Sequence, residues 1–422
     1  MKLDTTLFSK KYTFSSVKEV LAKANEKKSG DTLAGIGAAD AKERTAAKYV
    51  LSDLTVEEIT NSPAVDYKSD SVTRIILDDL NRAQYDKIKN LTIGELREKI
   101  LDNMISGDEI LQLAGGMCSE VIAALAKLMG NLDLMYVSRK LHVTATCNTT
   151  IGERGTFAAR LQPNHPTDDV KGVTASLLEG LSYGIGDAVI GLNPAIDTLK
   201  STADILTLFN DVKTKLAVPT QICVLSHITT QMQALRQGVP MDLCFQSIAG
   251  SEKALSSFGT DVDMLAEANE LMAERGTAKG PNYLYFETGQ GSELSSNSHN
   301  GADQLVMESR CYGLARHYKP FLVNTVVGFI GPEYIFDSKE LVRAALEDNF
   351  CGHMHGLPMG CDICYTNHMK ADQNDCDSLL VMLASSGCHY VIGVPQSDDV
   401  MLMYQSTSYH DIAAVREMLG LS

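Results

Sequence analysis

Several apolar runs in the second half of the chain end in a polar or charged residue, which a fully buried strand would not favour. The charged residues at these ends are Arg160, Glu287 and Asp362. Two amides accompany them: Gln162, which strand alternation places on the same face as Arg160, and Asn193. Buried charges are costly unless they are paired or hydrogen-bonded, so the two carboxylates require a cation nearby. That cation is Arg160, a metal ion or an ammonium group on a substrate.

The elements that must position these residues form a regular alternation of predicted strands and helices from about residue 155 onward. The predicted strands are 156–162, 187–193, 221–227, 243–249, 283–287, 321–328, 357–364 and 389–395. Helical patterns follow them at 167–182, 197–216, 229–236, 262–274, 301–318, 338–350, 375–386 and 409–419. Such consecutive strand–helix units predict an α/β fold with a closed (β/α)8 TIM barrel, and an open doubly wound sheet is the alternative. The polar residues fall at the carboxyl ends of the predicted strands, where barrel enzymes carry their catalytic groups.

The first 150 residues show a different pattern, with apolar residues at three- and four-residue spacing. Helices are predicted at 17–27, 40–54, 70–88, 92–104 and 108–129. Thr92 and Glu95 have the spacing of a capping box at a helix start. No strand-like alternation of comparable clarity appears there. We therefore predict a mainly helical N-terminal domain over residues 1–150 and a catalytic barrel over residues 151–422.

The composition narrows the classes of partner and compartment. The net charge of −16 makes the chain a poor ligand for nucleic acids and for anionic membranes, and it suits a cationic substrate only weakly. The N-terminus lacks the apolar core of a signal peptide, and no stretch reaches the length of a membrane span. The ten cysteines, many within apolar runs, are predicted to be reduced core residues. A cytoplasmic protein follows from these observations.

Other residues with chemical potential have competing interpretations. His227, Glu287 and Asp362 could hold a divalent metal in a hydrolase or aldolase, although metal barrels commonly offer more than one strand-end histidine. Cys361 and Cys364 form a C-x-x-C, for which packed core cysteines are favoured over a zinc or redox site. A non-catalytic scaffold is the third hypothesis, but it has no need for two carboxylates and an arginine at one mouth.

Three further histidines are less specific. His353 and His355 are predicted to be solvated loop residues, and no metal site is predicted from them. His165, just after Gln162, either shuttles protons at the mouth or caps a loop. The predicted strands contain no lysine, which disfavours Schiff-base chemistry. The acidic loop 395–399 lacks the glycine-rich character of a barrel phosphate site, which disfavours a phosphate ester as substrate.

The strand-end segments resemble the large subunit of the ethanolamine ammonia-lyase family. The segments that carry the resemblance are 155–164, 186–194, 284–291, 323–334, 359–362 and 364–368. Several are long and uninterrupted, and the resemblance runs from Met1 to the last predicted helix. It implies that ethanolamine is converted to acetaldehyde and ammonia by radical chemistry that adenosylcobalamin supplies.

The resemblance also implies roles for individual residues and for partners. Carried over by position, the substrate shell comprises Arg160, Gln162, Asn193, Glu287 and Asp362, of which Arg160, Glu287 and Asp362 are the expected catalytic residues. The expected cobalamin contacts are Pro194, Gln246, Ser295 and Met401, with Phe258 as a wall of the cavity. A small subunit, self-association of large subunits and a location within a bacterial microcompartment are further expectations.

Overall fold

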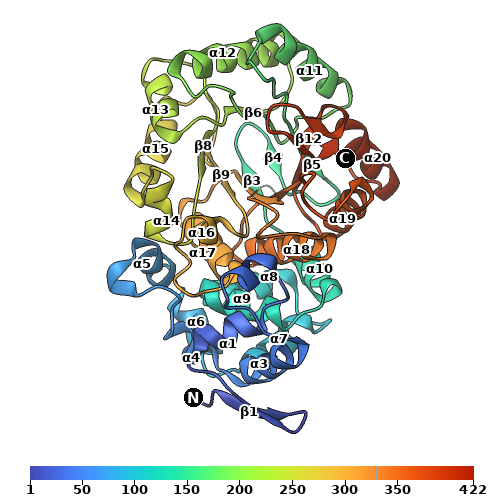
Figure 1. Cartoon of the computed structure of the whole chain (residues 1–422). Helices are drawn as coiled ribbons and strands as arrows, with labels where there is room; N and C mark the ends of the chain where they lie inside the picture. Colours follow the sequence, from blue (N-terminus) through green and yellow to red (C-terminus); the bar gives the residue numbers. More distant parts are fainter. Residues whose placement is uncertain (329) are drawn as a thin grey trace.

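The computed structural model describes residues 1–328 and 330–422. They form a barrel with a layer of helices packed against one side of it (Figure 1). Phe329, which lies in the resemblance segment 323–334, is outside the described residues. No helix in the described part of the chain is long and apolar enough to cross a membrane.

The barrel consists of eight parallel strands in the described part of the chain. They are β5 (Ala158–Leu161), β6 (Val189–Leu192), β7 (Ile222–Val224), β8 (Cys244–Ser247), β9 (Leu284–Thr288), β10 (Leu322–Val327), β11 (Met359–Ile363) and β12 (Tyr390–Val394). Successive strands pair in parallel, apart from β7 and β8, and β12 returns to pair with β5. This pairing confirms the predicted barrel and rules out the open sheet. Each strand lies where a predicted one was placed, usually shorter by one or more residues at each end.

Between β7 and β8, side chains take the place of the strand ladder. A backbone hydrogen bond from Leu243 N to Ile222 O (3.3 Å) joins their amino-terminal ends, but the two strands do not pair. Further along, the buried amide of Gln231 donates to the carbonyls of Ser226 (2.6 Å) and Phe245 (2.7 Å) and accepts from Phe245 N (2.8 Å). Gln231 therefore satisfies backbone groups that the parting of the strands would otherwise leave unpaired.

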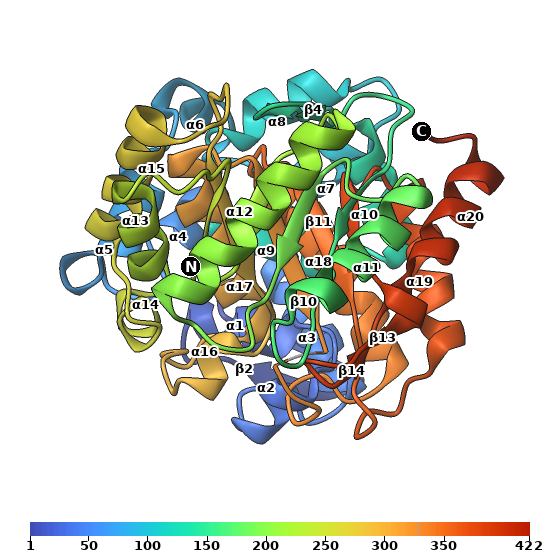
Figure 2. The same cartoon turned by 90° about the horizontal axis from the view of Figure 1, so that it is seen from above.

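Helices surround the strands (Figures 1 and 2). They are α11 (Val170–Ser182), α12 (Leu199–Leu216), α13 (Ile228–Arg236), α14 (Glu252–Ser257), α15 (Val262–Arg275), α16 (Ser292–Ser295), α17 (Gln304–Tyr318), α18 (Ser338–Met354), α19 (Gln373–Ser385) and α20 (Tyr409–Leu419). The helix predicted after each strand is present, and α14 and α16 are short additions. The loop after β12 forms a hairpin of β13 (Asp398–Asp399) and β14 (Tyr404–Gln405), and then β15 (Thr407–Ser408) pairs with β12.

The N-terminal region contains more breaks than its periodicity predicted. Its helices are α1 (Val17–Ala24), α2 (Ser29–Leu33), α3 (Ala41–Asp53), α4 (Val56–Thr60), α5 (Ser71–Asp78), α6 (Arg82–Ile88), α7 (Ile93–Leu101), α8 (Gly107–Ala114), α9 (Ser119–Lys127) and α10 (Asn131–Lys140). The predicted helix 70–88 is two helices because Asn81 caps α6. The predicted helix 108–129 breaks after α8, where a Cβ on Gly116 would lie 2.3 Å from Tyr85 N. The capping box of Thr92 and Glu95 is confirmed.

The hairpin of β1 (Asp4–Leu7) and β2 (Lys10–Thr13) was not predicted. Its turn residues Phe8 and Ser9 adopt left-handed φ values of 53° and 59°. Hairpin turns with two such residues are usually marked by Asn-Gly or Asp-Gly, and this sequence offers neither there.

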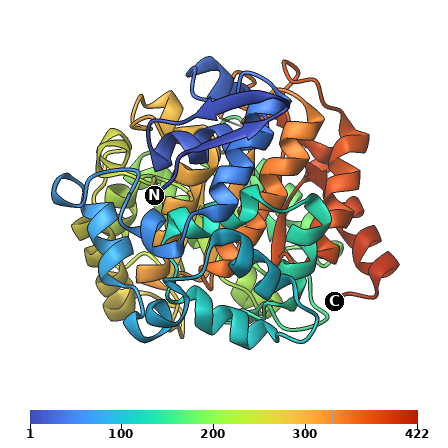
Figure 3. The ribbon, with the colours of Figure 1, turned by 90° about the horizontal axis from the view of Figure 1, so that it is seen from below.

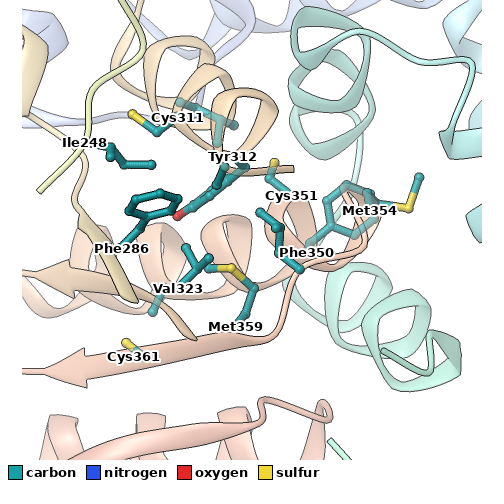
Figure 4. Packing of buried hydrophobic residues seen from close by; sticks show 14 of the residues in the cluster. Ile248, Phe286, Cys311, Tyr312, Val323, Phe350, Cys351, Met354, Met359 and Cys361 are labelled. Carbon is teal, nitrogen blue, oxygen red and sulfur yellow. The ribbon is translucent and has the colours of Figure 1, made fainter. Parts of the chain in front are cut away.

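Helices α17 and α18 lie between the barrel strands and the N-terminal helices, which cover them when the molecule is seen from below (Figures 1 and 3). Phe286, Val323 and Met359 of the strands pack against Tyr312 of α17 and Phe350 of α18 (Figure 4). Each large side chain buried in this way contributes roughly 1.5–3 kcal/mol. One hydrophobic cluster is thus continuous across residue 150, and the boundary between two domains there stays a prediction.

Buried ion pairs also join the N-terminal region to α18, to α17 and to Asp303, the residue that caps α17. They are Lys28–Glu347 (2.7 Å), Lys127–Asp303 (2.5 Å), Arg310–Asp70 (3.0 Å) and Arg310–Glu120 (2.7 Å). Burial alone would raise the pKa of Glu347, but Lys28 and Arg343 outweigh it and lower that pKa to about 2. Each pair has one member on either side of the joint.

The amino-terminal end of the barrel, near residues 221 and 282, is filled by a hairpin of β3 (Ala145–Thr146) and β4 (Thr150–Ile151). Its side chains Ala145, Cys147 and Ile151 join a second hydrophobic cluster with Tyr285 and Tyr390 of the barrel interior. The ten cysteines, all among the described residues, are buried and unpaired, as predicted. The barrel is therefore a packed core that leaves its polar groups at the carboxyl ends of the strands.

Candidate functional site

Arg160, Asn193 and Glu287 meet at the carboxyl ends of β5, β6 and β9. The guanidinium of Arg160 donates from Nη1 to Glu287 Oε1 (2.9 Å) and from Nη2 to Asn193 Oδ1 (2.6 Å). The side chain of Arg160 is 1% exposed. Gly191 on β6 makes room for it, because a Cβ at Gly191 would lie 3.0 Å from Arg160 Nε. Three of the predicted shell residues therefore form one hydrogen-bonded group.

Within the described residues, the carboxylate of Glu287 accepts its hydrogen bonds on one of its two oxygens. Besides Arg160, the donors to Oε1 are the Tyr285 hydroxyl (2.8 Å) and Asn324 Nδ2 (3.1 Å). No group among residues 1–328 and 330–422 donates to Oε2, and the side chain is 14% exposed. Oδ1 of Asn324 is buried and likewise has no partner in the described part of the chain. Glu287 Oε2 is thus an acceptor available to a donor that enters the mouth, whereas Asn324 Oδ1 is enclosed by protein.

The charge of Arg160 is held in place by its surroundings. Burial disfavours a charged guanidinium, but the neighbouring Tyr285 and Glu287 outweigh this effect and raise the pKa of Arg160 above its ordinary value. The guanidinium also lies over the Tyr285 ring, 5.6 Å from its centroid. Arg160 is therefore a fixed positive charge beside Glu287 and Asn193 at the strand ends.

Asp362, near the end of β11, is buried and accepts from Tyr404 OH on Oδ2 (2.6 Å) and from Ser406 Oγ on Oδ1 (2.8 Å). Burial raises its pKa to about 6, although the bonds from Tyr404 and Ser406 oppose this. The negative charge of Glu287 raises the pKa further and that of Arg160 lowers it. Glu287, two strands away, is therefore near enough to affect the pKa of Asp362.

Gln162 uses its amide nitrogen twice. Nε2 donates to Asp399 Oδ2 (2.7 Å) and to the hydroxyl oxygen of Tyr404 (3.0 Å). An amide nitrogen has two hydrogens, so only the carbonyl oxygen of Gln162 is left for a ligand. Asp399 and Tyr404 were not singled out from the sequence. The available signal was a carboxylate in the loop directly after the last barrel strand.

A cavity of about 420 Å³ lies beside Glu287, over the ends of β7 to β10. Two residues expected at the cofactor, Gln246 and Phe258, line it together with Phe245 and Thr288. A larger groove of about 910 Å³ lies between the N-terminal helices and α18 and α19, and none of the strand-end residues lines it. The smaller cavity is the candidate site, because a charged strand-end group, Glu287, lines it.

The other expected cofactor contacts lie on the rim of the mouth. Pro194 follows β6 and is half-buried. Ser295 is exposed in α16, where its Oγ donates to the Ser292 carbonyl (2.8 Å). Met401, in the loop after β12, is half-buried, and its backbone N–H donates to Asp399 Oδ1 (3.0 Å).

The metal interpretation finds little support in these contacts. His227 caps α13, with Nδ1 2.8 Å from Thr229 Oγ1 and Nε2 3.1 Å from the Phe258 carbonyl. Both ring nitrogens are therefore engaged. No three His, Cys, Asp or Glu side chains are grouped as metal ligands within residues 1–328 and 330–422.

The histidines outside the mouth occupy structural positions. The prediction that His353 and His355 are solvated was wrong, because α18 extends through residue 354 and packs both of them inside. His353 Nε2 lies 3.0 Å from His389 Nδ1, and His355 Nε2 lies 3.0 Å from Ser119 Oγ. His165 caps its own loop, where Nδ1 accepts from the backbone N–H groups of residues 167 and 169.

Comparisons with known proteins show which family has a similar sequence. The family model described as ethanolamine ammonia lyase large subunit (EutB) matches residues 12–422. The ethanolamine ammonia-lyase large subunits of Escherichia coli (strain K12) and Salmonella typhimurium are each 54% identical to this chain over 421 residues, which is 100% of this chain and 93% of theirs. Among solved structures, a phospho-2-dehydro-3-deoxyheptonate aldolase from Thermotoga maritima covers 65% of this chain and 72% of its own, at 11% identity and a TM-score of 0.38. That likeness is too distant to add to the argument.

Proposed function

This chain belongs to the ethanolamine ammonia lyase large subunit family, and from that premise we propose that its barrel mouth converts ethanolamine to acetaldehyde and ammonia. The observation that supports this most directly is the set of acceptors at the mouth. Glu287 Oε2 and the carbonyl oxygen of Gln162 have no donor within the described residues. An ammonium group carries three donors and a positive charge, and it matches such a set.

The two ends of ethanolamine are bound by different chemistry. Glu287 and Asp362 accept charge-assisted hydrogen bonds from the ammonium, each worth roughly 1.5–3 kcal/mol. Arg160 and Asn193 hold the hydroxyl oxygen, because the guanidinium presents donors and is already fixed by Glu287 and Asn193. The two carboxylates lie on β9 and β11, with β10 between them, so they contact the amine from different sides of the mouth.

We propose adenosylcobalamin as the cofactor, and the mouth has features that fit a large, flat, partly apolar group. Ile196, Val400 and Met403, on the loops after β6 and β12, expose 60%, 54% and 79% of their surface. Pro194, Gln246, Ser295 and Met401 would hold the cofactor. When bound, it supplies a carbon radical that removes hydrogen from the carbon bearing the hydroxyl.

The chain's own residues then keep the substrate in place while its amine shifts from one carbon to the next. Glu287 and Asp362 retain the nitrogen, and Arg160 stabilises negative charge that develops on the oxygen. The interior below the mouth is filled by Tyr285, Tyr390 and the β3–β4 hairpin, which excludes water from that side. Asp362, with a pKa of about 6, is mainly a carboxylate at neutral pH and attracts the cation.

The proposal extends to partners and location. The name of the relatives, large subunit, implies a small-subunit partner, and we propose that it covers the cofactor at the mouth. Self-association of large subunits, a cytoplasmic location and enclosure in a bacterial microcompartment are proposed on the same family basis.

The direct test combines the chain with its small subunit, adenosylcobalamin and ethanolamine and measures acetaldehyde. Turnover that requires all four components supports the proposal, and its absence in the complete mixture refutes it. Visible spectra of the bound cobalamin, with and without ethanolamine, follow the cofactor separately. Stoichiometric metal by elemental analysis, with activity lost to a chelator, would favour the metal-dependent barrel enzyme instead.

A further inference from the structure

Asp399 connects the proposed substrate site to the loop after β12. The side chain is 2% exposed and accepts four hydrogen bonds. Oδ2 accepts from Gln162 Nε2 (2.7 Å) and Asn164 Nδ2 (2.8 Å). Oδ1 accepts from the backbone N–H groups of Met401 (3.0 Å) and Leu402 (2.7 Å). One oxygen therefore holds two side chains at the end of β5, and the other holds the loop.

We infer that Asp399 is a positioning residue that sets the orientation of the Gln162 amide and couples it to the loop carrying Met401. This inference rests on the proposed function, because it assigns Gln162 to the substrate. Asp399 itself does not contact the substrate in this scheme.

The direction of the hydrogen bonds determines which end of the Gln162 amide faces the ligand. A carboxylate only accepts, so the nitrogen of Gln162 must face Asp399. The hydroxyl hydrogen of Tyr404 goes to Asp362 Oδ2 (2.6 Å), so the Tyr404 oxygen accepts the second amide hydrogen. With both hydrogens used, Gln162 presents an acceptor to the mouth. A reversed amide would present a donor, which repels an ammonium.

The same carboxylate reaches the end of β6 through Asn164. Because Asn164 Nδ2 donates to Asp399, its Oδ1 is turned toward the backbone N–H of Asn193, from which it accepts (2.8 Å). Asn193 in turn accepts from Arg160 through its side chain (2.6 Å). Asp399 therefore influences two residues: Gln162, whose amide faces the amine, and Asn193, whose side chain is proposed to bind the hydroxyl.

The first experiment compares Asp399→Asn with the matched control Asp398→Asn in the complex with the small subunit. Asp398 is the exposed neighbour, whose Oδ1 accepts only from Gln405 Nε2 (3.2 Å) within the described residues. An asparagine at 399 keeps one acceptor oxygen and places an NH2 donor at the other position, so it cannot hold the two amide nitrogens and the two loop N–H groups at once. We expect KM for ethanolamine to rise about tenfold or more in Asp399→Asn, with a smaller fall in kcat. Asp398→Asn should remain within twofold of wild type.

A double variant separates orientation from general damage. If Asp399 acts through Gln162, adding Asp399→Asn to Gln162→Leu should raise KM less than twofold beyond Gln162→Leu alone. Single effects that multiply in the double variant would overturn the claim that Asp399 sets the orientation of Gln162.

Hydrogen exchange of the full chain in the same complex gives a readout that does not depend on turnover. Asp399→Asn should speed exchange at Met401 and Leu402 and also at Asn193, which is distant in sequence, by about tenfold. Unchanged exchange at Asn193 would overturn the coupling. A wild-type complex that binds cobalamin but makes no acetaldehyde would refute the proposed function alone, since exchange still decides whether Asp399 couples these elements.

Asn164→Ala serves if Asp399→Asn does not fold. It keeps the carboxylate but removes one of its donors. Exchange should then rise at Asn193 and at Met401 together, and a rise at Asn193 alone would count against the coupling.

Discussion

Replacement of Glu287 by glutamine separates the charge of this residue from its shape. The glutamine carbonyl can still accept the bonds that Oε1 receives from Arg160, Tyr285 and Asn324. The change falls on the other atom, where Oε2, an acceptor without a donor among the described residues, becomes an NH2 donor. The fold of the mouth is therefore retained while the ammonium loses its counter-charge.

The magnitude follows from the bond that is lost. A hydrogen bond to a charged group is worth roughly 1.5–3 kcal/mol, and a donor facing the ammonium adds repulsion. At about 1.4 kcal/mol per tenfold change, the loss lies in the range of roughly 10- to 150-fold. Preorganised electrostatic partners at active sites show losses of about 100-fold or more. We therefore expect kcat/KM for Glu287→Gln to fall on the order of 100-fold.

The assay is steady-state formation of acetaldehyde by the reconstituted complex. Glu153→Gln, an exposed carboxylate at the opposite end of the barrel, is the matched control for a change of net charge. A value of kcat/KM for Glu287→Gln within threefold of wild type, with cobalamin binding intact, would refute the role of Glu287 in amine binding.

Further outcomes are expected from the same geometry. Because burial raises the pKa of Asp362 to about 6, kcat/KM should fall as the pH drops below that value. Asp362→Asn should weaken amine binding and flatten this acid limb of the pH profile. An identical acid limb in the variant would assign it to another group. Gly191→Ala places a Cβ 3.0 Å from Arg160 Nε and should lower kcat about tenfold with little change in melting temperature, so a large drop in stability would contradict it. Gln231→Leu leaves the backbone N–H and carbonyl of Phe245 without their partner. It should lower the free energy of unfolding, measured by denaturant titration, by about 3 kcal/mol. A change under about 1 kcal/mol would show that β7 and β8 can close on each other.

The sequence was sufficient for the barrel because its strands are short, apolar and separated by long helical patterns. A polar residue that ends such a run, as Glu287 and Asn193 do, has few structural reasons to be there. The register of parallel strands then brings these ends to one mouth. Arg160 and its two partners could thus be predicted as neighbours without coordinates.

The contacts of Gln162, His353 and Gln231 depend on how loops and helix ends fold, which the spacing of apolar residues does not predict. Asp399 and Tyr404 reach Gln162 only because the loop after β12 folds into a hairpin over the mouth. His353 is buried because α18 extends beyond its apolar pattern. Gln231 bridges two strands that do not pair, a relation that becomes visible only once the sheet order is known.

The ion pairs at the joint bear on how this protein could change over time. The barrel side contributes Glu347, Asp303 and Arg310, and each meets its opposite charge on a residue of the first 150. Each part holds only one charge of every pair, so an excised barrel would expose charged side chains that are buried and paired in the whole chain. A chimera with a crossover near residue 150 keeps these pairs only where the other parent carries the matching charge. Compatibility of two parents at this joint can therefore be judged from the residues at these few positions.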